Sequence, residues 1–113
     1  MRRGDIYQTD LNPTQGSEQA GTRPVVIVSR DAINEHSPVV IIVPLTGAEN
    51  RSKFYPTHVR LPAGSGGLIK NSIAVAEQVR AIAKTRLKTN IGHLKFETMS
   101  LISTALKIAM DLP

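Results

Sequence analysis

Short apolar runs alternate with polar segments rich in glycine and proline through the first three quarters of the chain. Continuous apolar runs are typical of strands buried on both faces, and alternating runs are typical of half-exposed strands. The pattern predicts five strands, at residues 5–11, 24–28, 39–45, 57–61 and 72–82. Proline cannot donate a ladder hydrogen bond, so Pro44 predicts an edge position or a bulge near the end of the third strand.

The last part of the chain has a different period. From Phe96 onward, apolar residues recur every three or four positions, which predicts a helix with one apolar face. Residues 30–34 and 84–87 each predict a short helical turn. Strands followed by a helix predict a mainly β fold with α elements (α+β), namely a small β-barrel or strongly curved sheet closed by a C-terminal helix.

Length and composition narrow the possible classes of protein. A chain of 113 residues is expected to form a single domain over residues 1–113. It has no cysteine, which excludes disulfides and thiolate chemistry and fits a reducing cytoplasm. No apolar run approaches the roughly 20 residues of a membrane helix, so no membrane association is expected. The three histidines lack metal-ligand spacing, and no motif indicates a cofactor, so neither a metal nor a cofactor is expected.

Positive charge is concentrated in the middle of the chain. The net charge is +5, and residues 50–95 carry nine basic side chains and one acidic side chain, Glu77. This distribution indicates either a polyanionic partner, such as nucleic acid or an acidic protein, or a solvated lysine-rich surface. Composition alone leaves both open.

A long polar loop leads into the second apolar run, and Arg23 stands where the two meet. Thr46 ends the next apolar run. If these strands pair antiparallel, Arg23 lies near Thr46, and a guanidinium beside a hydroxyl could bind a phosphate or an oxyanion. Alternatively, Thr46 is a turn residue and Arg23 forms a surface salt bridge. The spacing alone favours this simpler interpretation.

Several longer motifs follow one another over nearly the whole chain. They are R-G-D-I-Y at 3–7, D-L-N-P-T-Q-G-S-E-Q-A-G-T-R-P-V-V-I-V-S at 10–29, P-L-T at 44–46, Y-P-T-H-V at 55–59, E-Q-V-R at 77–80, K-T-R-L at 84–87, I-G-H-L at 91–94 and A-L-K-I-A at 105–109. In this order they resemble MazF/PemK-type toxins, the endoribonuclease half of bacterial toxin–antitoxin pairs. The resemblance implies an SH3-like barrel, a homodimer, and metal-independent, sequence-specific cleavage of single-stranded RNA. It also implies inhibition by an acidic antitoxin.

The resemblance assigns the catalytic pair to Arg23 and Thr46. The resemblance further implies that the 2′-OH of RNA is the nucleophile and that the products carry a 2′,3′-cyclic phosphate and a 5′-OH. Because the pKa of arginine exceeds about 12, Arg23 is expected to stabilise charge rather than to act as the base. Glu18, water or a phosphate oxygen are the candidates for the base.

Further residues are expected to contact RNA. They are Asn12, Ser17, Gln19, Arg51, Lys53, Phe54, Tyr55, His58, Gln78 and Arg80. Phe54 and Tyr55 are candidates for base stacking, although they could equally anchor their own loop. Two other functions remain open: a non-enzymatic toxin of the same fold that poisons DNA gyrase, and an RNA- or DNA-binding barrel.

Overall fold

The computed structural model describes residues 1–50 and 53–113. Within these residues the chain forms seven strands, two α-helices and four 3₁₀ turns. Their bounds are β1 Asp5–Asp10, β2 Thr22–Ile27, α1 Asp31–His36, β3 Val39–Gly47, η1 Ala48–Asn50, β4 His58–Leu61, η2 Ser65–Gly67, β5 Ser72–Val75, η3 Ala76–Gln78, β6 Arg80–Ala83, η4 Lys84–Arg86, β7 Leu87–His93 and α2 Phe96–Met110.

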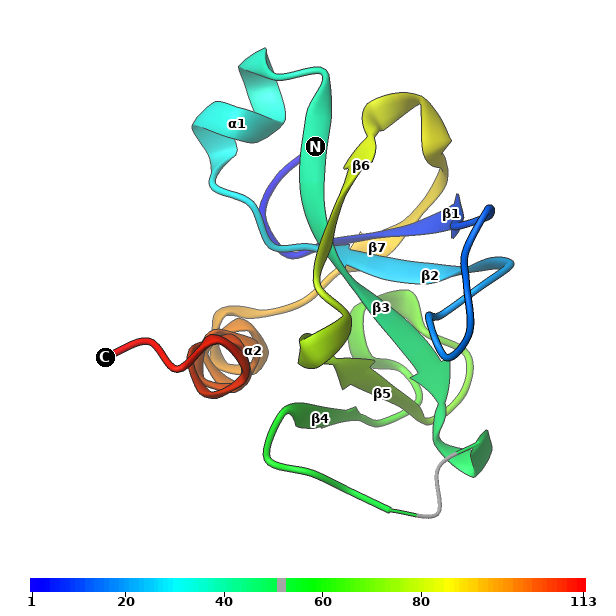
Figure 1. Cartoon of the computed structure of the whole chain (residues 1–113), viewed down its shortest axis with the longest axis vertical. Helices are drawn as coiled ribbons and strands as arrows, with labels where there is room; N and C mark the ends of the chain where they lie inside the picture. The colour runs from blue at the N-terminus through cyan, green and yellow to red at the C-terminus, as the bar shows by residue number, and fades with distance from the viewer. Residues whose placement is uncertain (51–52) are drawn as a thin grey trace.

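All strand pairs are antiparallel, and β3 is the central strand. The sheet follows the order β4-β5-β3-β2-β1-β7, with β6 pairing the first part of β3. Because β3 pairs β6 at its start and β5 at its end, the sheet bends around it, and α2 packs beside β4 and η3 (Figure 1). The α+β class with a C-terminal helix is confirmed. The sheet resembles a barrel in its curvature, but its end strands β4 and β7 do not pair with each other in the described residues.

The apolar runs of β2 and β3 are buried on both faces, as their sequences predict. Val25 and Ile27 belong to one apolar cluster, whereas Val26 between them belongs to the other. Ile42 and Val43 of β3 divide in the same way. This arrangement holds the ends of β2 and β3 rigidly against each other.

Pro44 does not mark an edge strand, because β3 lies inside the sheet. It pairs with Val25 of β2, and it stands between Ile42, the last residue that pairs with β6, and Leu45, the first that pairs with β5. Pro44 therefore lies where β3 exchanges one partner strand for another, so its missing N–H group coincides with a break in the ladder.

The prediction of one long strand over residues 72–82 is wrong in one respect, because η3 divides this segment into β5 and β6. Ser72 and Arg80 are eight positions apart, whereas their partners on β3, Gly47 and Ile42, are five positions apart. Three extra residues therefore bulge out of the ladder and form η3. Bulges commonly redirect side chains next to functional sites, and this one projects Glu77 and Gln78.

The sequence pattern missed β7, because this strand contains few apolar residues and is mostly exposed. The C-terminal helix is confirmed as α2. Met99, Ile102 and Ala105 are its buried residues. Two further apolar residues of this helix, Leu101 and Ile108, are 58% and 50% exposed.

Candidate active site

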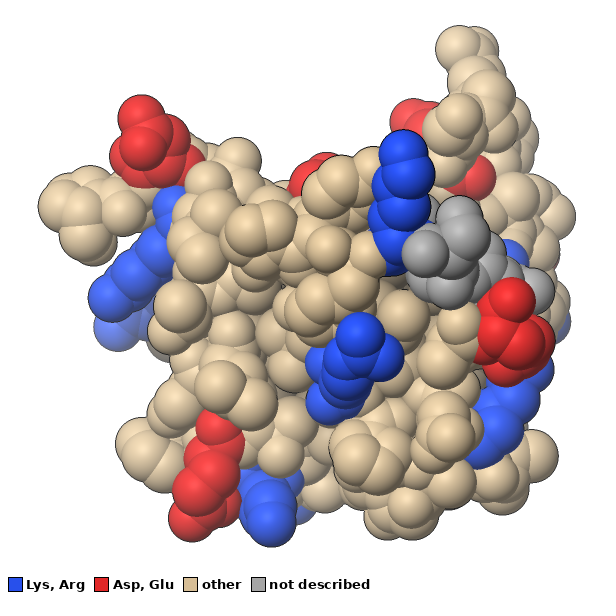
Figure 2. Space-filling view, turned by 90° about the horizontal axis from the view of Figure 1, so that it is seen from below, with Lys and Arg blue, Asp and Glu red and all other residues tan. Residues whose placement is uncertain are grey.

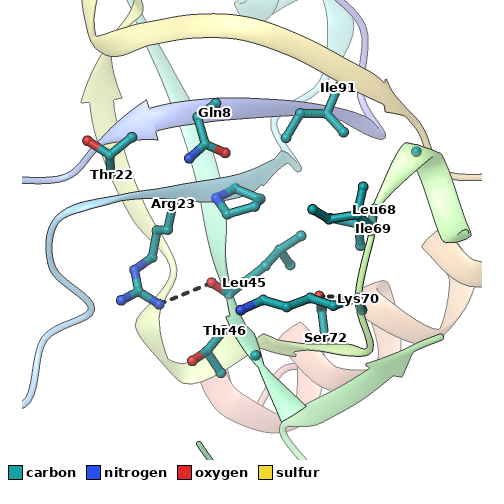
Figure 3. A pocket seen from close by; sticks show the side chains of 13 residues that line it. Gln8, Thr22, Arg23, Leu45, Thr46, Leu68, Ile69, Lys70, Ser72 and Ile91 are labelled. Atoms are coloured by element: carbon teal, nitrogen blue, oxygen red, sulfur yellow. Dashed lines mark hydrogen bonds between the residues drawn. The ribbon is translucent and has the colours of Figure 1, made fainter. Parts of the chain in front are cut away.

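Arg23 and Thr46 lie beside each other at the meeting point of β2 and β3. The two strands pair antiparallel, with Val25 opposite Pro44. Continuing this register by two residues brings Arg23 opposite Thr46. The guanidinium of Arg23 donates from Nη1 to the backbone oxygen of Leu45, the neighbour of Thr46, at 3.3 Å. The juxtaposition that antiparallel pairing predicts is therefore present (Figure 3).

Both side chains line an open pocket of about 490 Å³. Gln8 of β1 forms part of its wall, and Ile69 and Lys70 stand on the opposite rim (Figure 3). Sequence reasoning did not identify these three residues. Ile69 and Lys70 are on the loop before β5, and their position depends on long-range pairing that no local pattern signals. The pocket therefore combines a guanidinium, a hydroxyl and an ammonium group with an apolar wall.

The orientation of Arg23 depends on the loop before it. Its Nε donates to the backbone oxygen of Ala20 at 2.8 Å. Together with the bond to Leu45, this bond fixes the guanidinium plane between the loop and β3. Thr46 is 6% exposed, and its backbone pairs with Ile73 of β5. A rigid fork of donors beside a hydroxyl suits an oxyanion or a phosphate.

The loop between β1 and β2 is closed at its base by several hydrogen bonds. The amide of Leu11 donates to the oxygen of Gly21 at 3.0 Å, and the amide of Gly21 donates to Oδ1 of Asn12 at 3.1 Å. Arg86 donates to the backbone oxygens of Asp10 and Asn12. Asn12 therefore shapes the loop through its side chain and its backbone.

Glu18, Ser17 and Gln19 do not line the Arg23 pocket. With Gln78 and Arg80 they line a neighbouring hollow of about 390 Å³. The carboxylate of Glu18 accepts the amide N–H of Gln15 at 2.6 Å. The side chain of Arg80 donates to the backbone oxygen of Leu11 at 3.3 Å. These residues therefore form a second surface, separate from the Arg23 pocket.

Phe54 and Tyr55 are exposed next to β4, at 44% and 49%. The rings of both meet the imidazole of His58 edge-on. The guanidinium of Arg60 lies 4.2 Å from the centre of the Phe54 ring. The two rings thus pack against neighbouring side chains but remain exposed to solvent, as a stacking surface requires. Lys53 is exposed beside them, and Arg51 lies outside the described residues.

His58 itself supports this loop from inside. Its side chain is buried, and its Nδ1 accepts the backbone N–H of Tyr55 at 3.2 Å. Nε2 therefore carries the ring proton and donates to Glu77 at 3.1 Å. The buried ring is placed to hold the loop in shape rather than to face a ligand.

Glu77 on η3 connects these groups. Partial burial alone would raise the pKa of its carboxyl, but hydrogen bonds from Thr57, from its own backbone amide and from His58 outweigh burial and lower the pKa below 4.5. Thr57 donates to Oε1 at 2.7 Å. Glu77 is therefore ionised near neutral pH and joins η3 to β4.

The basic side chains do not form one continuous patch on the face that Figure 2 shows. Lysines and arginines stand at separate points among uncharged side chains, with acidic groups between some of them. Lys70 forms an exposed ion pair with Glu49, with 3.3 Å between Nζ and Oε1. On this face the positive charge is divided among separate positions.

The described part of the chain offers neither a cluster of metal ligands nor a membrane-spanning helix. In residues 1–50 and 53–113, no cluster of three or more histidine, cysteine, aspartate or glutamate side chains could hold a metal ion. No helix in this part of the chain is long and apolar enough to cross a bilayer.

Comparison with known proteins extends over the whole chain. Residues 2–110 match the model of a family described as "PemK-like, MazF-like toxin of type II toxin-antitoxin system". The chain is 44% identical over 112 residues to Endoribonuclease MazF of Staphylococcus saprophyticus, covering 99% of this chain and 92% of that protein. Motif resemblance and overall similarity thus agree.

Solved structures show the same fold. A mycobacterial endoribonuclease, solved in complex with its cognate antitoxin, is 30% identical with a TM-score of 0.83, covering 100% of this chain and 97% of that chain. MazF from Deinococcus radiodurans is 23% identical with a TM-score of 0.84, covering 99% and 97%, which supports the fold alone. The chain belongs to the family of PemK-like, MazF-like toxins of type II toxin–antitoxin systems.

Proposed function

We propose that this protein is a toxin that cleaves single-stranded RNA at specific sequences, with Arg23 and Thr46 at the reacting phosphate. The observation that carries the proposal is their placement in one open pocket at the meeting of β2 and β3. The name of the 44% identical relative, Endoribonuclease MazF, supports the activity. The proposed reaction needs neither a metal nor a cofactor, because RNA supplies its own nucleophile.

In the proposed reaction the 2′-oxygen attacks the adjacent phosphorus and the P–O5′ bond breaks. The products are a 2′,3′-cyclic phosphate and a 5′-hydroxyl; the 2′-OH loses a proton and the 5′-oxygen gains one. Negative charge grows on the non-bridging oxygens of the pentavalent phosphate, and preorganised donors aimed at that charge lower the barrier. Arg23 supplies the guanidinium, which two backbone oxygens orient, and Thr46 supplies a hydroxyl.

The base is a separate question. Arginine stays protonated at physiological pH, so Arg23 is unsuited to accept the proton. The carboxylate of Glu18 caps the amide of Gln15 and lines the neighbouring hollow. We therefore favour water or a phosphate oxygen of the substrate as the proton acceptor.

RNA binding is proposed to continue from the pocket toward the exposed rings. Lys70 on the rim can exchange its ion pair with Glu49 for a phosphate, because an exposed pair of this kind contributes little stability. Bases splayed out of the strand can stack on Phe54 and Tyr55. Lys53 lies beside the rings, where it can contact the phosphate backbone.

The proposal includes two protein partners. The mycobacterial relative was solved with its cognate antitoxin, and an acidic antitoxin segment would compete with RNA for Arg23 and Lys70. A homodimer in the cytoplasm completes the proposal, as the family resemblance implies.

Cleavage of defined single-stranded RNAs in EDTA tests the activity. We expect products with 2′,3′-cyclic phosphate and 5′-hydroxyl ends, identified by mass spectrometry. Arg23→Ala and Thr46→Ala should abolish cleavage, with the fold checked by circular dichroism and thermal melting. Intact RNA across many sequences, together with inhibition of DNA supercoiling by gyrase, would instead favour the non-enzymatic toxin.

A further inference from the structure

The side-chain amide of Gln78 is held by the loop that orients Arg23. Its Oε1 accepts the backbone N–H of Gln19 at 3.0 Å, and its Nε2 donates to the backbone oxygen of Ser17 at 3.0 Å. One amide thus pairs with a donor and an acceptor two residues apart, as a neighbouring strand would. Gln78 is about sixty positions away in sequence, so these bonds join distant parts of the chain.

Ala20, the residue after Gln19, connects this contact to the active site. Ala20 presents its backbone oxygen to Nε of Arg23 at 2.8 Å. The position of that oxygen depends on the path of the loop, which Gln78 fixes one residue earlier. At the other end of the loop, Gly21 is held by Asn12 and Leu11. The hydrogen bonds of Gln78 therefore hold the part of the loop that lies away from its base.

Gln78 belongs to η3, whose backbone is held by hydrogen bonds. The amide of Val79 donates to the oxygen of Ala76 at 3.1 Å, and the amide of Ala76 donates to the oxygen of Thr57 at 3.0 Å. Its neighbour Glu77 is held by Thr57 and His58. Since η3 is the three-residue bulge between β5 and β6, the ladder with β3 fixes its position. The loop is thus fastened to a part of the sheet that does not depend on the loop.

We propose that Gln78 is a positioning residue that clamps the β1–β2 loop to η3 and so sets the guanidinium of Arg23 for catalysis. The role in catalysis rests on the proposed function, whereas the clamp itself does not. This role differs from direct base recognition, since both polar atoms of the Gln78 amide are engaged by the loop. Loss of the clamp leaves the catalytic groups present but less well placed, and small displacements from reactive geometry are costly.

The test replaces Gln78 by methionine, which keeps the length of the side chain and removes both hydrogen bonds. Gln15→Met is the matched control, because Gln15 is an exposed residue of the same loop that uses only backbone groups in the hydrogen bonds described above. Gln78→Glu is a second variant that can still accept from Gln19 but cannot donate to Ser17 when ionised. Thermal melting checks that each variant folds.

The first readout is amide hydrogen exchange in the absence of RNA. In Gln78→Met we expect exchange at the Gln19 amide and at Nε–H of Arg23 to accelerate about tenfold, the scale of one lost hydrogen bond. Gln78→Glu should protect Gln19 partly, and Gln15→Met should match the wild type. Unchanged exchange at both positions in Gln78→Met would overturn the clamp.

The second readout is RNA cleavage. Gln78→Met should lower kcat by about tenfold or more with a smaller change in KM, because positioning matters most in the transition state. A raised KM with unchanged kcat would indicate direct RNA contact and overturn the proposal. If the wild-type protein cleaves no RNA, the proposed function fails, and the exchange rates still decide whether Gln78 clamps the loop.

Discussion

Position 23 requires a side chain with a permanent charge and several donors in one plane. Arg23 donates a hydrogen bond from Nε to the backbone oxygen of Ala20 and another from Nη1 to the backbone oxygen of Leu45. These bonds orient the guanidinium where the pocket also presents the hydroxyl of Thr46. The fork geometry of arginine, rather than its charge alone, therefore explains why this residue type occupies the site.

The first prediction separates fork geometry from charge. Arg23→Lys keeps the positive charge but cannot reproduce both oriented hydrogen bonds, so we expect the cleavage rate to fall by about 10²- to 10³-fold. Single-turnover cleavage measures the effect. Arg30→Lys, at an exposed arginine before α1, is the control. A wild-type rate in Arg23→Lys would show that charge alone is sufficient.

The ionised state of Glu77 leads to a prediction about pH. Its folded-state pKa lies below 4.5, so its contribution to folding is present above 4.5 and is lost as the pH falls through the folded-state value. Because 42% of the side chain is exposed, the contribution should stay below about 1 kcal/mol. The stability difference between the wild type and Glu77→Gln should therefore shrink in acid.

Denaturant unfolding between about pH 3 and about pH 7 checks this sign. Glu35→Gln on the exposed surface of α1 provides the comparison. A difference between the wild type and Glu77→Gln that grows as the pH falls would contradict the assignment of Glu77 as a stabilising carboxylate.

Among the elements, η3 holds two loops that carry candidate RNA-binding residues. The three-residue bulge at η3 places Glu77 on the β4 side and Gln78 on the β1–β2 loop. The loop before β4 exposes Phe54 and Tyr55 over the buried ring of His58. Two loops that carry candidate RNA-binding residues are thus held by the same short turn.

The exposed rings give a prediction at this scale. Phe54→Ala and Tyr55→Ala should each weaken binding of single-stranded RNA, by about 1–3 kcal/mol for a ring that stacks on a base. Fluorescence anisotropy on RNA with a 2′-deoxy block at the cleavage site measures binding without turnover. Phe96→Ala is the matched control, because Phe96 is 81% exposed at the start of α2. Unchanged affinity would assign the rings to anchoring their loop.

At the scale of the whole molecule, antiparallel strand pairing brings residues that are distant in the sequence together in one site. The apolar runs of β2 and β3 predicted their burial. Antiparallel pairing, which the structure shows, brings Arg23 near Thr46, although the spacing alone favoured a turn threonine and a surface arginine. The sequence could not place Lys70 in the pocket, because no local periodicity reports which loop faces which strand. The sequence pattern also predicted one strand over residues 72–82, because the apolar alternation continues through both β5 and β6. The ladder with β3 is nevertheless interrupted between them.

Charge distributed over the surface predicts a salt-dependent interaction with RNA. Affinity should fall linearly with salt on logarithmic axes, with a slope near 0.7 for each phosphate contacted on a single strand. Lys70→Ala should reduce the slope by about that amount. Lys107→Ala, in the last turn of α2, should leave it unchanged. An identical slope in the Lys70 variant would remove this lysine from the RNA-binding surface.

The central claim is that Arg23 and Thr46 act as one unit on the same phosphate. Single-turnover cleavage in EDTA by the wild type, Arg23→Ala, Thr46→Val and the double variant forms a double-mutant cycle that tests it. We predict that each single change removes most of the rate acceleration, and that the double variant is little slower than the worse single variant. Additive losses would show that the two residues act independently. Cleavage at the wild-type rate in the double variant would contradict the proposed site.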